Sequence, residues 1–393
     1  MSLLPVSHTQ FQLKSYWDQF FSKRSTPFEW YGQYTDLCHI LHKYVKITSK
    51  TLVVGCGNSK LSEDMYDAGI TDITNIDISE VVVKKMGARN FEKRAKMSFT
   101  QMDMLTMTFD DCVFECVLDK GTLDAIYSNT DDETVAKVRC MWEEIRRVLK
   151  TGGRYVCITL AQQHILNSLL ETFSSGWLVR THKVTLDDGK RDEKREVAGT
   201  LPVIVFILTK MASLPAKPAM KVLEVVREDG RCERCEDTEG VRRFVNAAQQ
   251  HSMLLHHLKS VHPEETGIRV QYWSEKVPDV PRYTFIVVDV PKSKAKNGLF
   301  AIFIVPQGRE GEWIFSSDSG LKGLAEQSCY HRLVVVTMHL GHQYGDLHQV
   351  KHEVTGSALA MLQSGVPSNI KLPILSTGEG VGEGCVCVRV CPQ

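Results

Sequence analysis

The fold is decided by the stretch Thr51-Leu-Val-Val-Gly-Cys-Gly-Asn-Ser-Lys60, in which a hydrophobic run ends in a Gly-x-Gly turn. Twenty residues after Gly57, a second apolar run ends in Asp77. Glycines let the backbone of a turn approach a ligand closely, and an acid at the end of the second strand accepts hydrogen bonds from two ribose hydroxyls. The two segments together predict a site for a nucleotide-type cofactor.

Strands and helices alternate around this turn, which is typical of a doubly wound, mostly parallel α/β sheet. An aromatic-rich helical segment at 11–46 comes first. We expect seven strands, at 52–54, 73–78, 98–103, 114–119, 154–160, 176–182 and 203–209. We expect helices between them at 61–68, 81–91 and 132–148. The sequence therefore predicts a Rossmann-like domain over residues 1–210, with a charged loop at 187–196.

The rest of the chain has a different character. Residues 211–270 are charged and predict a largely helical linker. Residues 271–376 predict a smaller β-rich, antiparallel module with strands at 283–290, 299–305, 312–315 and 331–338. Residues 377–393 alternate Gly with Glu and then Val with Cys, and we expect a disordered, atypical tail.

Composition limits the partners of the chain. The 47 basic and 47 acidic residues cancel, so no overall field attracts nucleic acid or an acidic membrane. No apolar run approaches the roughly 18 residues that suggest a membrane span. The N-terminus does not resemble a secretory signal. The 12 cysteines are scattered, and Cys232-Glu-Arg-Cys235 has no second pair at zinc spacing. We therefore expect a cytoplasmic protein with reduced cysteines and no metal site.

Three cofactors compete for the predicted site: NAD(P), FAD and S-adenosylmethionine. A dinucleotide places its pyrophosphate at a helix N-terminus through a third glycine, and Lys60 stands at that position here. S-adenosylmethionine has no phosphate and tolerates this residue. Asp103 and Asp119 end the third and fourth strands, so three acids frame one edge of the sheet. This combination favours S-adenosylmethionine.

Four motifs carry a resemblance to a family: Glu29-Trp-Tyr-Gly32, Val54-Gly-Cys-Gly-Asn-Ser59, Asn75-Ile-Asp-Ile-Ser79 and Leu118-Asp-Lys-Gly-Thr-Leu-Asp-Ala125. They resemble the seven-β-strand lysine methyltransferases that modify translation elongation factor 1-alpha, over residues 1 to about 376. The resemblance implies a protein lysine methyltransferase that modulates translation. Two-unit members of the family also carry a C-terminal unit that methylates the α-amino group of the factor. We expect that this chain stops where such a unit would begin, so α-amino methylation is not expected.

The resemblance also implies site residues. Those expected to contact the cofactor lie on the N-terminal helix and at the strand ends: Trp17, Phe21, Gly55, Gly57, Asp77, Ile78, Asp103, Met104, Asp119 and Lys120. Those expected to face the substrate are Trp30, Tyr31 and Asp124. The target lysine must arrive neutral, which an aromatic entrance favours by disfavouring the charged form. No residue need be an essential acid or base, although Asp119 or Asp124 is a candidate acceptor for the lysine proton.

Two other functions stay open at this point. Fold alone does not fix a substrate, so a small-molecule methyltransferase is one alternative. The other is a non-enzymatic, cofactor-binding partner protein, in which the β-rich half holds a partner or a second copy in a homodimer.

Overall fold

The computed structural model describes residues 5, 7–24, 26–184, 201–212, 221–227, 230–260, 268–274, 277–290, 298–346, 349–350, 353–354, 376–378 and 386–390. The predicted charged loop at 187–196 lies outside these residues. The chain divides into two compact units, Met1–Ser252 and Met253–Gln393. Within the described part of the chain, no helix is both long enough and apolar enough to cross a membrane.

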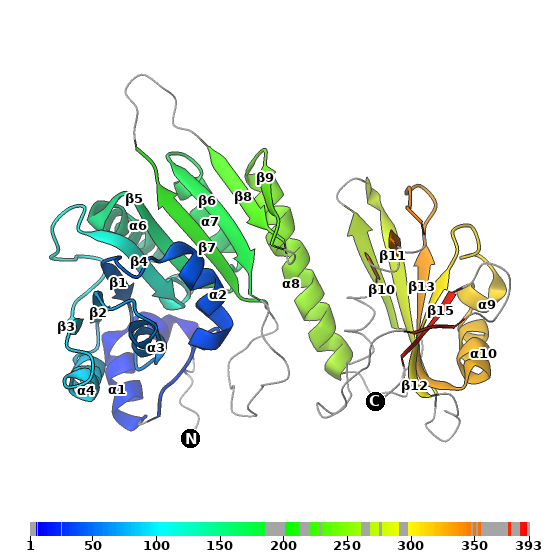
Figure 1. Cartoon of the computed structure of the whole chain (residues 1–393), viewed down its shortest axis with the longest axis horizontal. Coiled ribbons are helices and arrows are strands. Elements are labelled where there is room, and N and C mark those ends of the chain that lie inside the picture. The colour runs from blue at the N-terminus through cyan, green and yellow to red at the C-terminus, as the bar shows by residue number, and fades with distance from the viewer. Residues whose placement is uncertain are drawn as a thin grey trace. The chain divides into compact units, whose positions relative to one another are not determined.

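The first unit is built on a nine-stranded sheet with the order β3-β2-β1-β4-β5-β7-β6-β8-β9 (Figure 1). The strands are β1 (Thr51–Val54), β2 (Ile73–Asp77), β3 (Met97–Gln101), β4 (Phe114–Lys120), β5 (Leu149–Thr159), β6 (Trp177–Lys183), β7 (Ile204–Lys210), β8 (Val222–Val226) and β9 (Cys232–Cys235). Strands β3, β2, β1, β4 and β5 are mutually parallel, whereas β7 is antiparallel to both of its neighbours. The predicted doubly wound α/β fold is confirmed. The chain order reverses between β1 and β4, where such folds bind their ligands.

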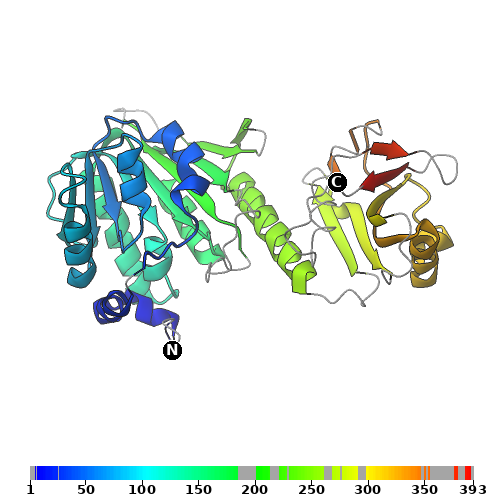
Figure 2. The ribbon, with the colours of Figure 1, turned by 60° about the horizontal axis from the view of Figure 1, so that its bottom comes forward.

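Alternation along the strands sends side chains into two cores, one on each face of the sheet. Leu52 and Val54 join the core beneath α6 (Asp132–Val148), α7 (Gln163–Phe173) and α8 (Thr238–Ser260). Val53 joins the opposite core beneath α2 (Tyr34–Tyr44) and α3 (Leu61–Asp67). Helices therefore lie on both faces of the sheet (Figure 2). Because both faces of β1 are covered, its sequence is apolar at each of positions 52–54.

The N-terminal segment adds a third small core outside the sheet. It contains the 3-10 helix η1 (His8–Gln12) and α1 (Lys14–Lys23), and α1 packs on α4 (Glu80–Asn90) through Phe20, Phe21, Val82 and Met86. Two polar contacts fix this packing. The Ser79 hydroxyl donates to Asp18 at 2.6 Å, and the Lys85 ammonium donates to the carbonyl of Phe21.

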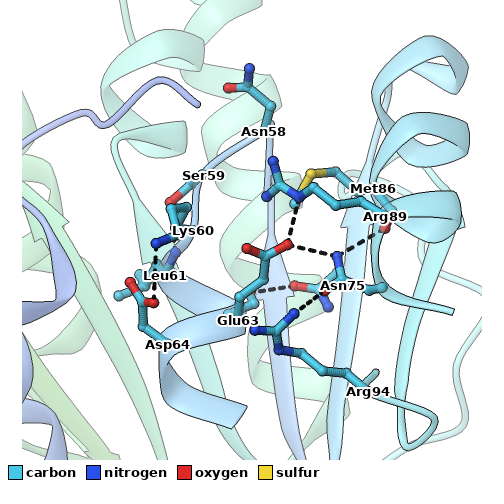
Figure 3. A network of polar contacts seen from close by, with 12 residues as sticks. Asn58, Ser59, Lys60, Leu61, Glu63, Asp64, Asn75, Met86, Arg89 and Arg94 are labelled. Atoms are coloured by element: carbon cyan, nitrogen blue, oxygen red, sulfur yellow. Dashed lines mark hydrogen bonds and ion pairs between the residues drawn. The ribbon is translucent and has the colours of Figure 1, made fainter. Parts of the chain in front are cut away.

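A buried polar network joins α3 to α4 (Figure 3). Glu63 is 4% exposed and accepts from the Arg89 Nε at 2.6 Å and from the Asn90 amide at 2.8 Å. The Ser62 hydroxyl donates to Asn75 of β2 at 2.6 Å. A buried carboxylate is stable only when it is paired and hydrogen-bonded. The network therefore fixes α3, and with it the turn that precedes α3.

The range 211–270 contains helical structure, as predicted, in α8, but it also contains two strands that were not predicted. Strand β8 pairs in parallel with β6, and β9 closes a hairpin on β8. Leu223 and Val225 of β8 are buried in the same core as Val241 and Val245 of α8. These strands were not predicted because both are short and flanked by charged residues. This part of the chain extends the first unit to residue 252, beyond the predicted end at 210.

The second unit contains a six-stranded sheet with the order β10-β11-β13-β12-β15-β14. The strands are β10 (Ile268–Ser274), β11 (Val277–Asp289), β12 (Gly298–Val305), β13 (Tyr330–Met338), β14 (Ser376–Gly378) and β15 (Val386–Val390). Between β11 and β13, Asp289 and Arg332 are register partners and form a buried ion pair with both contacts at 2.6 Å. The predicted β-rich module is present in this unit.

Three details of this unit differ from expectation. Residues 313–316 form the short helix α9 rather than a strand, and α10 (Asp318–Ser328) follows it. Strands β12 and β13 are parallel, not antiparallel, because these helices form a crossover between them. In the range 377–393, expected to be disordered, Val386–Val390 pairs with β12. Alternating Val and Cys suits a strand, because β-branched residues fit the pleated surface of a sheet.

Candidate cofactor site

The Gly-x-Gly turn lies at the end of β1 and requires glycine at two positions. Gly55 and Gly57 have φ values of +60° and +52°, in the left-handed region that glycine adopts without strain. A Cβ on Gly55 would sit 2.2 Å from the hydroxyl oxygen of Thr122. That hydroxyl donates to the carbonyl of Val54 at 3.1 Å, so Thr122 closes over the turn.

Asp77, at the end of β2, faces this turn. One carboxylate oxygen accepts from the Gly57 N–H and the other from the Ser79 N–H, both at 2.9 Å. Burial raises the pKa of Asp77 to about 6, although both backbone hydrogen bonds favour the ionised form. Each oxygen of a carboxylate has two acceptor positions, so both retain capacity for a ligand hydroxyl.

A pocket of about 270 Å³ opens beside the turn. Its walls come from the N-terminal segment, the ends of β1, β2 and β4, the loop after β3, and α5 (Thr122–Ile126) with Lys137 of α6. It is lined by Phe11, Gln12, Trp17, Phe21, Phe28, Trp30, Gly55, Cys56, Gly57, Asn58, Ser59, Ile76, Asp77, Ile78, Met102, Asp103, Met104, Leu105, Lys120, Gly121, Thr122, Ala125, Ile126 and Lys137.

Aromatic rings of the N-terminal segment cover one side of the pocket. Trp17 stacks on Phe21 at 5.7 Å between ring centroids and on Phe11 at the same distance. The indole N–H of Trp17 donates to the carbonyl of Phe11 at 2.7 Å. Gln12 anchors the segment to the start of α6 and the loop before it, because its amide donates to the hydroxyls of Thr134 and Ser128, each at 3.0 Å. This side of the pocket is therefore apolar and held by specific polar contacts.

Glu29 holds the opposite end of the N-terminal segment. Its carboxylate accepts from the Lys60 N–H and the Ser59 hydroxyl, each at 2.6 Å, and from the Lys120 ammonium at 2.7 Å. Glu29 lies in the motif Glu29-Trp-Tyr-Gly32, but it was not among the predicted site residues. Its position next to Trp30, a predicted site residue, was the feature of the sequence that could have indicated a role at the site.

Most predicted site residues line the pocket: Trp17, Phe21, Trp30, Gly55, Gly57, Asp77, Ile78, Asp103, Met104 and Lys120. Asp119 does not. It is fully buried and accepts from the N–H groups of Thr122 and Leu123 and from the hydroxyl of Tyr155. Burial raises the pKa of Asp119 to about 7. Asp119 therefore supports the loop after β4 from beneath and has no surface in the pocket.

Tyr31 and Asp124 also lie behind the pocket wall. Tyr31 is 5% exposed with a φ of +58°, and its ring lies against Gly121, where a Cβ would come within 3.0 Å. Asp124 accepts from the Thr159 hydroxyl at 3.0 Å and the Leu160 N–H at 3.1 Å, and burial raises its pKa to about 6. Of the three residues expected to face the substrate, only Trp30 lines this pocket.

Comparison with known proteins places this geometry in a family. Residues 52–157 match the family described as methyltransferase domain. The eEF1A lysine and N-terminal methyltransferase of Bos taurus is 42% identical over 397 residues, which cover 100% of this chain and 56% of the relative. EEF1A lysine methyltransferase 4 of Bos taurus is 32% identical over 185 residues, which cover 45% of this chain and 72% of the relative.

The chain belongs to the eEF1A lysine methyltransferase family. It spans about half the length of the first of these relatives. Among solved structures, geranyl diphosphate C-methyltransferase from Streptomyces coelicolor, in complex with S-adenosyl-L-homocysteine, aligns with a TM-score of 0.38 and 13% identity. That alignment covers 53% of this chain and 100% of the other.

The methyl donor S-adenosylmethionine fits the pocket of this family member better than a dinucleotide does. The backbone N–H of Lys60, at the start of α3, already donates to the Glu29 carboxylate. A pyrophosphate at this position would meet that negative charge. The glycine turn and Asp77 supply what a nucleoside with an amino-acid tail requires. The matched domain and this pocket identify S-adenosylmethionine as the cofactor.

Several pocket residues of this family member were not predicted: Phe11, Gln12, Phe28, Asn58, Ser59, Met102 and Lys137. Asn58 and Ser59 lie inside the motif Val54-Gly-Cys-Gly-Asn-Ser59, so the sequence could have indicated that they line the pocket. Phe11, Gln12 and Lys137 come from η1 and α6, which are distant in sequence from any motif. The packing of η1 against α5 and α6 brings Phe11 and Gln12 to the pocket beside Lys137.

Proposed function

We propose that this chain transfers the methyl group of S-adenosylmethionine to a lysine side chain of translation elongation factor 1-alpha. The observation that carries the proposal is the pocket after β1 and β4, which combines the glycine turn with a wall containing Trp30. Relatives named for eEF1A lysine methylation, at 42% and 32% identity, support the choice of substrate.

In this proposal the residues of the pocket hold the cofactor along its length. The turn at Gly55 and Gly57 borders the methionine part, together with the Lys120 ammonium. Asp77 accepts from the ribose hydroxyls, and Asp103 lies beside the adenine. Trp17 and Phe21 cover the cofactor and exclude water. When bound, S-adenosylmethionine supplies a methyl group that its sulfonium has already activated for displacement.

The protein then has to present a neutral lysine in line with that methyl group. Orientation and exclusion of water supply most of the rate enhancement for such a displacement. An ordinary lysine has a pKa of about 10.4, so its ammonium must lose a proton before it attacks. The apolar face of Trp30 favours the neutral amine because it excludes water from the charged form. Before that proton is lost, a cation–π contact with the same ring draws the ammonium to the entrance.

Methyl transfer to purified elongation factor 1-alpha by the full chain tests the proposal. We expect peptide mass spectrometry to find methylated lysine on the factor, and Trp30→Ala to reduce the rate. S-adenosyl-L-homocysteine binding is measured on the same samples by calorimetry. Bound ligand without methyl transfer to the factor contradicts the proposed substrate, and transfer to metabolites instead supports a small-molecule methyltransferase.

The cellular setting of this reaction is also a proposal. The cysteines recorded for the described part of the chain are free thiols, which suits the reducing cytoplasm where translation takes place. A homodimer and the absence of direct nucleic-acid binding remain predictions. Detection of the chain in the cytosolic fraction of fractionated cells would support the proposed location, and an exclusively organellar signal would contradict it.

A further inference from the structure

Glu29 is not needed for the chemistry proposed above, yet its carboxylate accepts hydrogen bonds from three residues beside the pocket. Its side chain is 17% exposed and that of Lys120 is 7% exposed, so their ion pair at 2.7 Å is largely shielded from water. The same carboxylate accepts from the Ser59 hydroxyl and the Lys60 N–H. Glu29 therefore joins the N-terminal segment to the loops after both β1 and β4.

Other residues of the segment 26–31 also contact the loops after β1 and β4. The Asn58 side chain accepts from the Phe28 N–H at 3.1 Å and donates to the carbonyl of Thr26 at 2.9 Å. Tyr31 lies against Gly121, the residue after Lys120. Residues 26–31 are thus fastened to the two loops that frame the methionine end of the pocket. Phe28 and Trp30 of this segment form part of the pocket wall.

Lys120 has a specific arrangement of donors within this set of contacts. Its ammonium donates to the Glu29 carboxylate at 2.7 Å and to the carbonyl of Trp30 at 2.9 Å. An ammonium has three N–H donors, so one donor remains beyond these two contacts. Lys120 is among the residues that line the pocket, so this donor can serve an anionic group of a ligand there.

We propose that Glu29 is a positioning residue, which fixes the Lys120 ammonium for the carboxylate of the methionine end of the cofactor. The same contacts hold Phe28 and Trp30 in the wall through which the target lysine enters. Cofactor binding and the formation of the lysine entrance are therefore linked through one carboxylate. This inference rests on the proposed function, because it assumes a ligand with an amino-acid carboxylate.

The charge of Glu29 affects the protonation of Lys120, so its loss should change the pH dependence of ligand binding, which a loss of packing alone would not do. Burial lowers the pKa of Lys120, and the charge and hydrogen bond of Glu29 raise it. The other acids nearby are Asp77 and Asp103 in the pocket lining and Asp119, the preceding residue of β4, which is bonded to Tyr155. None of these forms a recorded ion pair with Lys120 in the described part of the chain. Without Glu29, the Lys120 ammonium loses its proton at a lower pH.

The experiment measures the Kd of S-adenosyl-L-homocysteine for the full chain by calorimetry at pH 7 and pH 9. The variants are Glu29→Gln, the charge-keeping Glu29→Asp, and the control Glu80→Gln. Glu80 is 56% exposed and pairs with Lys84 on α4, so its variant removes one acid outside the pocket. The α-amino group of the ligand also changes its protonation between these pH values, and it does so in every sample. The ratio of each variant's Kd to that of the wild type is therefore compared.

We expect Glu29→Gln to raise the Kd relative to the wild type at pH 7, because loss of a buried charged partner strongly weakens the contacts of the remaining charge. At pH 9 the ratio of the two Kd values should be about tenfold larger than at pH 7. Glu29→Asp should weaken binding with a smaller change between the two pH values, and Glu80→Gln should match the wild type. Equal weakening of Glu29→Gln at both pH values, or none, overturns the inference. If Glu29→Gln does not fold, Glu29→Asp decides the matter. The inference is then overturned if Glu29→Asp binds S-adenosyl-L-homocysteine with the Kd of the wild type at both pH values. Absence of binding by the wild type contradicts the proposed function itself.

Discussion

The backbone N–H of Gly57 donates a hydrogen bond to the carboxylate of Asp77 at 2.9 Å. These residues are adjacent because β1 and β2 are neighbouring parallel strands whose carboxyl ends meet at the same edge of the sheet. The Cys56 N–H also donates to the carbonyl of Ile76 at 3.1 Å. The acid that is proposed to hold the ribose therefore also fixes the turn that is proposed to hold the methionine.

Gly55→Ala should destabilise the chain by about 2–4 kcal/mol, because it combines a positive φ with overpacking against Thr122. Gly87→Ala is the matched control. Gly87 lies within α4, and a Cβ there meets nothing within 4 Å. We expect this control to raise stability by about 0.5–1 kcal/mol. Chemical denaturation of both variants checks the pair, and equal stability of the two would contradict the role given to Gly55.

Acidification through pH 6 should weaken cofactor binding, because the pKa of Asp77 is raised to about 6 and its carboxylate then becomes protonated. Folding responds in the opposite direction. The folded state binds this proton more tightly than the unfolded chain, in which the pKa is about 3.9, so this group lowers stability as the pH rises from 4 to 6. In Asp77→Asn, the weakening of cofactor binding through pH 6 and the fall in stability between pH 4 and pH 6 that come from this group should both vanish. Calorimetric Kd values and unfolding free energies between pH 4 and pH 8 test this, and an unchanged profile in the variant would refute it.

Asp119→Ala should cost about 2–4 kcal/mol, since it leaves the N–H groups of Thr122 and Leu123 and the hydroxyl of Tyr155 without their acceptor. Asp119→Asn should cost less because its carbonyl oxygen still accepts from both N–H groups. Unfolding free energies of the two variants provide the measurement. A folded Asp119→Ala variant with wild-type stability would show that the loop after β4 does not depend on this acid.

Trp17→Ala should raise the Kd for S-adenosyl-L-homocysteine by about 3- to 10-fold, the value of one aromatic contact. Trp17 stacks between Phe11 and Phe21 at the pocket, so its loss opens the apolar cover to water. Phe91→Ala is a suitable control because Phe91 is 81% exposed at the end of α4. Equal affinities of the two variants in calorimetry would argue against a cover formed by α1.

Arg332→Met should destabilise the second unit by about 3–5 kcal/mol, because it leaves the buried Asp289 carboxylate unpaired. The cofactor pocket lies in the first unit, so the Kd for S-adenosyl-L-homocysteine should change less than about twofold if the two units fold independently. Hydrogen exchange of β11 and β13 measures the stability of the second unit, and calorimetry measures the Kd. A large loss of affinity in this variant would reveal coupling between the units.

Sequence patterns alone were sufficient for features that depend on near neighbours in the chain. The helix at 132–148 was predicted with the bounds it has, because its apolar residues recur at helical spacing after the capping residue Asp131. Strand β1, the glycine turn and the acid ending β2 were predicted for the same reason. These signals are local: a periodicity, a turn that needs glycine, and a polar residue where a buried strand ends.

Tertiary structure decided which polar groups reach the pocket. Asp77 and Asp119 both stand at the ends of buried strands, yet Asp77 faces the pocket and Asp119 lies beneath the loop that Tyr155 helps to hold. Glu29 reaches the start of α3 only because residues 26–31 fold back across two loops. The role of an acid depends on which donors surround it in space, and those donors come from segments far apart in the sequence. The strand pattern therefore determined where a site would form, and the packing of the N-terminal segment decided which side chains build it.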